Sequence, residues 1–101
     1  MMPTRARAAS RAPEIDHPDW AANDAAKHLA DVEYVGKMEA VVFRFEDGRI
    51  FGVPLGKLEG LDETPITRVF VSMYGYEATI EQFSGNVLEV PWDVVLYHAG
   101  S

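Results

Sequence analysis

Alternating apolar and polar residues run through most of the chain after residue 30 and predict β-strands. The clearest alternation lies in Met38–Phe45. Asp47-Gly48 follows it, and this pair favours a two-residue type I′ turn that would place Phe45 opposite Ile50. The pattern therefore predicts a β-hairpin with one buried face, which carries Val41, Phe43, Phe45 and Ile50.

Further strands are expected where the same alternation returns: Val32–Val35, Thr67–Tyr74, Tyr76–Glu81 and Val87–Val90. Ser84-Gly85-Asn86 predicts a turn between the last two, and Gly75 is expected to break or bulge the strand before it. Pro54 ends a pairing or lies on an edge. Leu55, Leu58 and Leu61 then recur in a stretch with the spacing of a short helical turn or ordered loop.

Two helices are expected to pack on these strands. Asp19 or Asn23 can cap the first, which ends near Asp31 and whose apolar positions recur at helical spacing: Ala22, Ala25, Ala26 and Leu29. Pro91 opens a short C-terminal helix that packs back on the sheet through Trp92, Val95 and Leu96. The fold class is therefore α+β: a small antiparallel β-meander or hairpin sheet with an N-terminal and a short C-terminal helix. No internal repeat is visible in the sequence.

The chain is expected to hold one domain, residues 19–101, preceded by a disordered or loosely ordered basic arm, residues 1–18. Arg5, Arg7 and Arg11 make this arm basic. A mitochondrial presequence is the alternative reading of the arm, although the early Pro3 makes it a poor amphipathic helix.

Charge and composition exclude several classes of function. The formal net charge is −7, and without the three arginines of the arm it becomes −10, so the acidic body is not expected to bind nucleic acid. The absence of cysteine excludes disulfides, thiolate metal sites and cysteine nucleophiles. No apolar run approaches the roughly 20 residues of a membrane-spanning helix, so no membrane contact and a cytoplasmic location are expected.

The residues that carry chemistry form no recognised motif. The three histidines have no metal-binding spacing: His17, His28 and His98. A nucleophile–base–acid set drawn from Ser72 or Ser84 with His98 and Asp93 lacks a nucleophile elbow. Carboxylates suited to glycoside hydrolysis are also typical of an exposed sheet face: Glu77, Glu81 and Glu89. No phosphate-binding glycine loop occurs. We therefore assign no catalytic, cofactor-binding or metal-binding residue, and an enzyme is the less expected class.

Four aromatic residues near the predicted turns and the terminal helix indicate a candidate partner surface: Tyr74, Tyr76, Trp92 and Tyr97. Tyrosine and tryptophan are enriched at the residues that dominate protein interfaces, although core packing is the competing explanation for each.

Several short segments between Asp31 and Tyr97 are similar to the DUF2442 family of small bacterial proteins of unknown function: Phe43-Arg44-Phe45-Glu46-Asp47-Gly48, Val53-Pro54-Leu55 with Leu58, Val69–Val71 and Asp93-Val94-Val95-Leu96-Tyr97. Some members share a fold described as like the N-terminal domain of a Nitrosomonas protein. The family usually has a tryptophan on a strand ahead of the aspartate, whereas here Trp92 adjoins Asp93, and the residues before Asp31 are not typical of it. The resemblance implies a compact α+β domain of a bacterial cytoplasm, with no established activity.

Two hypotheses of function follow. The first is a non-catalytic protein-binding or regulatory module, whose partner would be basic because the body is acidic. The second is a small-molecule-binding domain or modest hydrolase, with a pocket between the sheet and the first helix, near the C-terminal helix, rimmed by Asp93, Tyr97 and His98. A homodimer without other components is a third.

Overall fold

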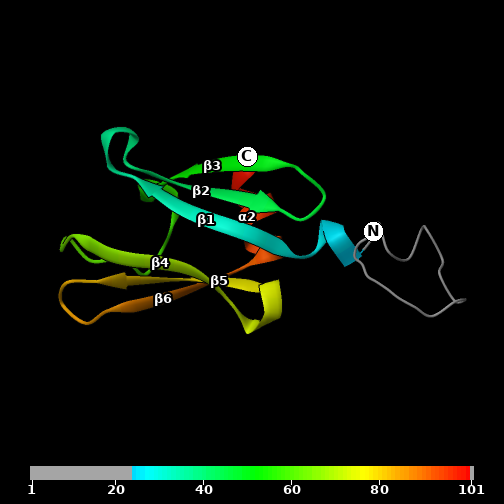
Figure 1. The fold of residues 1–101 in the computed structure, drawn as a ribbon. Coiled ribbons are helices and arrows are strands. Elements are labelled where there is room, and N and C mark those ends of the chain that lie inside the picture. The colour runs from blue at the N-terminus through cyan, green and yellow to red at the C-terminus, as the bar shows by residue number, and fades with distance from the viewer. Residues whose placement is uncertain (1–23, 101) are drawn as a thin grey trace, which may run out of the picture.

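The computed structural model describes residues 24–100, and within them strands dominate (Figure 1). The strands are β1 Leu29–Val35, β2 Ala40–Phe45, β3 Ile50–Pro54, β4 Ile66–Ser72, β5 Glu77–Gln82 and β6 Val87–Pro91. Short 3-10 turns follow three of them: η1 Gly36–Met38, η2 Leu55–Lys57 and η3 Met73–Gly75. Helix α2, Trp92–Ala99, ends the described chain. The predicted α+β class, with antiparallel meanders and a short C-terminal helix, is confirmed.

The strands form two antiparallel sheets of three strands each, in the orders β1-β2-β3 and β4-β5-β6. β1 and β4 lie side by side, one from each sheet (Figure 1). α2 follows β6 in the chain but packs against β3 of the other sheet. The two sheets and the helix therefore enclose one shared apolar core.

The second sheet repeats the first at a spacing of 37 residues, as the starts of the paired strands show: Leu29 and Ile66, Ala40 and Glu77, Ile50 and Val87. Both halves have a register irregularity in the first strand. Equivalent backbone hydrogen bonds also recur, since Glu46 N donates to His28 O at 2.9 Å and Phe83 N donates to Pro65 O at 2.8 Å. The expectation of no internal repeat was therefore wrong: the fold is a structural duplication.

The turn at Asp47-Gly48 has one residue more than predicted. Phe45 N donates to Arg49 O at 2.8 Å, and Gly48 N donates to Phe45 O at 3.0 Å. Gly48 has a φ of 95°, whereas Asp47 is not among the residues with positive φ. This is a three-residue loop with a glycine bulge, in which only one position needs left-handed backbone. The predicted facing of Phe45 and Ile50 was wrong, because Ile50 pairs with Arg44 and is 61% exposed.

The core combines the inward faces of both sheets with the segments that follow them. Val41, Phe43 and Phe45 are fully buried on β2, as predicted, and Ala78 and Ile80 take the same role on β5. Two residues from the segments after the sheets complete the core, Leu58 after η2 and Val95 of α2. These two residues are themselves 37 positions apart, so each half contributes an equivalent buried apolar side chain to the core.

The predicted N-terminal helix lies mostly outside the described residues, as does the predicted arm of residues 1–18. Its described end is helical only through Ala26, and the predicted extension to Asp31 was wrong. Leu29 begins β1, where it pairs with Phe45 and is 2% exposed. Burial in the core outweighs the helical preference of the neighbouring alanines. Among the described residues, no helix is long and apolar enough to cross a membrane.

Candidate functional site

The fold brings three of the four predicted partner residues together and separates the fourth. Trp92 N donates to Tyr76 O at 2.9 Å, and Tyr74 lies on the η3 turn just before Tyr76. Tyr97 instead lines a cavity beside α2. Trp92 and Tyr97 are five positions apart on one helix, which places them on different sides of it. The four residues that were predicted to form one partner surface therefore lie on two separate surfaces.

The first of these surfaces is an exposed turn that we call the aromatic turn, made of Met73, Tyr74 and Tyr76. Their side chains are 60%, 94% and 44% exposed. The backbone of this turn is left-handed, with φ of 51° at Met73 and 57° at Tyr74. Each non-glycine residue in that region costs about 1 kcal/mol or more. Sequence reasoning selected the tyrosines but gave no signal for this strained backbone.

Residues preceding β1 hold the base of the aromatic turn. The rings of His28 and Tyr76 lie 4.3 Å apart between centroids, and Lys27 Nζ lies 5.9 Å from the ring of Trp92. His28 Nδ1 lies 2.6 Å from Asp24 O, which fixes the imidazole. These contacts leave Tyr74 projecting from a supported base.

Gly75 lies close to the residues at the start of β1. Its φ is 95°, and a Cβ there would lie 3.0 Å from His28 Cδ2 and 3.2 Å from Leu29 O. Gly75→Ala is expected to lower the free energy of unfolding by about 2 kcal/mol, from backbone strain plus steric overlap. Gly85→Ala is the matched control, because Gly85 has a φ of 97° with nothing within 4 Å, and should cost about 1 kcal/mol. Urea denaturation measures both, and equal losses would contradict the close approach.

A polar network fixes the loop between η2 and β4. The side chain of Gln82, 4% exposed, donates to Asp62 O at 2.9 Å and to Thr64 O at 2.8 Å. Its Oε1 accepts from Asp62 N at 3.0 Å and from Asn86 Nδ2 at 2.6 Å. One buried amide thus organises a loop more than fifteen residues away in sequence.

The carboxylate of Asp62 belongs to the same network. It accepts from Ser84 Oγ at 2.5 Å, from Thr64 N at 2.8 Å and from Thr64 Oγ1. The side-chain hydrogen bond from Ser84, followed by those from Thr64, lowers the pKa of Asp62 below its ordinary value. A carboxylate held ionised in this way is a weak general base, so the Ser84–Asp62 pair is poorly suited to activating a nucleophile.

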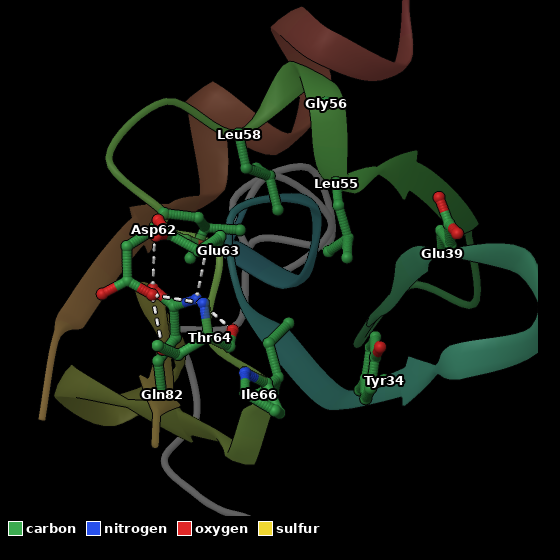
Figure 2. A pocket seen from close by; sticks show the side chains of 12 residues that line it. Tyr34, Glu39, Leu55, Gly56, Leu58, Asp62, Glu63, Thr64, Ile66 and Gln82 are labelled. Atoms are coloured by element: carbon green, nitrogen blue, oxygen red, sulfur yellow. Dashed lines mark hydrogen bonds between the residues drawn. The ribbon is translucent and has the colours of Figure 1, made fainter. Parts of the chain in front are cut away.

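A cavity of about 540 Å³, which we call the open mouth, lies beside this network (Figure 2). Its walls are partly apolar, from Tyr34, Leu55, Leu58, Leu61, Pro65 and Ile66. Glu39 lies at one side, and Asp62 and Glu63 lie at the other (Figure 2). Neither lysine nor arginine lines this cavity. Sequence reasoning did not find it, because its residues come from four separate stretches of the chain.

A second cavity of about 340 Å³, the helix cavity, lies between α2, β6 and the segment after η2. It is lined by Leu58, Glu59, Leu88, Glu89, Val90, Pro91, Val94, Tyr97 and His98. Tyr97 and His98 were expected at the rim of a pocket between the sheet and the first helix, and both instead line this cavity beside the C-terminal helix. Asp93 was expected beside them but does not line this cavity.

The other residues considered for chemistry lie on separate surfaces. Ser72 Oγ lies 2.8 Å from Thr79 Oγ1, and Ser84 bonds to Asp62, so the structure pairs each serine with a partner other than His98. Glu81 forms an ion pair with Arg68 at 3.1 Å on the outer face of its sheet. Within residues 24–100 no three histidine, aspartate or glutamate side chains gather in a metal-binding arrangement, and His17 lies outside them.

Comparison of the chain with models of known protein families, with curated proteins and with solved structures finds no match in any of the three. Membership of DUF2442 therefore stays a prediction from the sequence.

Proposed function

We propose that this domain is a non-catalytic protein-binding or regulatory module that contacts a partner protein through the aromatic turn. The observation that carries the proposal is Tyr74, whose side chain is 94% exposed on a backbone with a φ of 57°. A tyrosine here gains little from packing within the described chain and strains the backbone. Contact with another molecule explains such a residue better than folding does.

The proposed partner is a basic protein. The chain carries a formal net charge of −7, so a basic surface would be attracted over a long range and would associate faster. Tyrosine and methionine, which form the aromatic turn, are residues that protein interfaces favour. The proposal assigns no catalytic residue, cofactor or metal. A bacterial cytoplasmic location belongs to it as well, supported only by the resemblance to DUF2442.

A photo-crosslinking residue placed at position 74 tests this proposal. The protein it captures should then be purified and its dissociation constant measured with the full chain. Tyr74→Gly should weaken binding by at least about tenfold, since exposed tyrosines often dominate interfaces. The same substitution should leave the thermal midpoint unchanged or raise it, because glycine accepts a φ of 57° without strain.

The matched control is Phe83→Gly, which removes an aromatic side chain that is 77% exposed on a different turn. Its effect on the dissociation constant should be less than about twofold. Equal affinities of the wild-type and Tyr74→Gly chains would overturn the proposal. Crosslinks formed only between copies of this chain would replace it with a homodimer.

The helix cavity favours a second candidate function, the binding of a small apolar molecule. Its volume of about 340 Å³ falls in the range of small-ligand pockets, and Leu88, Val94 and Tyr97 supply apolar wall. Glu89 and His98 supply polar groups at the same cavity. Few convergent polar groups in a mostly apolar pocket are typical of such sites.

A thermal-shift screen of metabolites checks this second candidate. A ligand at 100 times its dissociation constant should stabilise the chain by about 2.7 kcal/mol. Val94→Trp, which fills the cavity, should abolish the shift. A hit that shifts the wild-type and Val94→Trp chains equally would place binding elsewhere, and a library without hits would remove the candidate.

A further inference from the structure

The duplication gives the fold two equivalent openings, each bounded by the segment before the first strand of one half and the residue after the first 3-10 turn of the other half. Four pairs of residues define the comparison, and the two members of each are 37 positions apart: Lys27 and Thr64, His28 and Pro65, Glu39 and Tyr76, Leu55 and Trp92. Backbone hydrogen bonds at these positions match. Leu55 N donates to Glu39 O, and Trp92 N donates to Tyr76 O, each at 2.9 Å. The two openings can therefore be compared at these four pairs, although the backbone is left-handed at Glu39 (φ 50°) and right-handed at Tyr76 (φ −78°).

Large side chains meet across one opening, which we call the closed mouth. The His28 ring lies 4.3 Å from that of Tyr76, and Lys27 Nζ lies 5.9 Å from the Trp92 ring. A cationic side chain on an aromatic face is an attractive contact in itself. The chain thus covers this opening with its own histidine ring, and the exposed Lys27 lies at its edge.

The open mouth carries smaller or acidic residues at the same positions. Thr64 and Pro65 replace the lysine and histidine, and Leu55 replaces the tryptophan. Glu39 stands in place of Tyr76, so a carboxylate replaces the ring. These residues do not span the opening, which leaves the volume of about 540 Å³ (Figure 2).

Glu39 is unusual for its position as well as its charge. Its φ is 50° and its ψ 49°, a left-handed conformation in which glycine or asparagine would be less strained. Its side chain is exposed at the edge of the cavity rather than packed into the core. Folding alone would favour glycine or asparagine at this position.

The lining has the chemistry of a site for a cation on an apolar stem. Leu55, Leu58 and Ile66 provide apolar wall, while the acidic residue Glu39 lies at one side of the cavity and Asp62 and Glu63 lie at the other (Figure 2). Hydrogen bonds from Ser84 and from Thr64 lower the pKa of Asp62. Lysine and arginine side chains place their charge on a long apolar stem, and arginine pairs with carboxylates through a fixed donor geometry.

We propose that the open mouth binds an arginine or lysine side chain of a peptide segment from a partner protein. The inserted cation would take the place that Lys27 occupies in the closed mouth, with carboxylates in place of the aromatic face. This site is separate from the aromatic turn. A cationic occupant is expected because the chain has a net negative charge and the charged residues that line the cavity are all acidic.

Titration of the ¹⁵N-labelled full chain with acetyl-Leu-Arg-Leu-amide tests the proposal, with acetyl-Leu-Gln-Leu-amide as the neutral probe. The arginine peptide should shift amide resonances of the residues that line the open mouth, and its affinity should fall as salt rises. Glu39→Gln and Glu63→Gln should each weaken it by about threefold, the size expected of a partly exposed ion pair. Glu46→Gln removes an exposed carboxylate that does not line the cavity and should leave affinity unchanged.

A second variant transplants the closed mouth onto the open one. The double variant Glu39→Tyr, Leu55→Trp should abolish peptide binding, while its amide spectrum should show that the chain is still folded. Should this variant fail to fold, the two glutamine variants decide the question alone. Tyr74→Gly should bind the peptide as the wild-type chain does, so this site and the aromatic turn succeed or fail separately.

Three results would overturn the proposal. The first is equal binding of the arginine and glutamine peptides. The second is an effect of Glu46→Gln as large as that of Glu39→Gln, which would indicate general charge attraction. The third is binding that appears only after Arg5, Arg7 and Arg11 are replaced by alanine in the full chain, which would make the chain's own N-terminal segment the occupant.

Discussion

Replacing Phe43 with alanine is expected to lower the free energy of unfolding by about 4 kcal/mol. Phe43 is fully buried at the centre of the first sheet, where it pairs with Val32 on one side and Phe51 on the other. Removing its ring leaves a cavity that two hydrogen-bonded neighbouring strands cannot close by moving together. The loss combines the transfer free energy of the ring with the cost of that cavity.

Phe83→Ala is the control for this substitution. It removes the same side chain at a position that is 77% exposed on the second hairpin, and it should change the free energy of unfolding by less than about 0.5 kcal/mol. Guanidinium denaturation of both variants gives the comparison. A loss below about 1.5 kcal/mol for Phe43→Ala would contradict a core closed between the two sheets. The free energy of unfolding of a native domain is only about 5–15 kcal/mol, so the predicted loss is a large part of it.

Much of the strand pattern could be read from the sequence, because one-sided burial imposes a period of two. Val41, Phe43 and Phe45 share the buried face as predicted, and so do Ala78 and Ile80. Turn length could not be read in the same way. Asp-Gly fits both a two-residue turn and a three-residue loop with a glycine bulge, and the choice between them shifts the register by one residue.

The duplication escaped sequence reasoning because a β-meander needs few fixed residues. At the spacing of 37, the two halves share only four identical residues: Val32 with Val69, Gly48 with Gly85, Val53 with Val90 and Pro54 with Pro91. These serve the buried face, the left-handed turn position and the strand end. Other positions require only an apolar or a polar side chain. Many different residues meet that requirement, so a sequence comparison of the two halves does not detect the structural repeat.

The candidate sites also differ in how far the sequence could predict them. Exposed tyrosines could be selected from the sequence as residues suited to contact, although their separation into the aromatic turn and the helix cavity required the fold. The open mouth could not be selected, because Glu39 becomes informative only when Tyr76 is known to be its structural equivalent. The residue types predict which side chains are suited to contact with a partner. Comparison of the two halves of the fold is needed to see that one of the two equivalent openings is not filled by the chain's own side chains.

Gln82 is where the two halves differ most inside the core, since its equivalent is the fully buried Phe45. An amide replaces a ring there because the loop before β4 presents polar backbone groups to it. Gln82→Leu should therefore destabilise the chain, although leucine is more apolar. Asp62 N, Asp62 O and Thr64 O would each lose their bond to this amide. We expect a loss of about 3 kcal/mol, because unsatisfied groups cost more than the bonds contribute on average.

Amide hydrogen exchange separates this explanation from a simple packing defect. Asp62 N bonds to Gln82 Oε1, whereas Thr64 N bonds to Asp62 Oδ1 and keeps its acceptor in the variant. Exchange at Asp62 should therefore accelerate more than exchange at Thr64. Ser72→Ala is the control, because it removes one side-chain hydrogen bond, 2.8 Å to Thr79, and should cost about 1 kcal/mol. Unchanged protection of the Asp62 amide in Gln82→Leu would show that the loop, and the open mouth it borders, is held by other contacts.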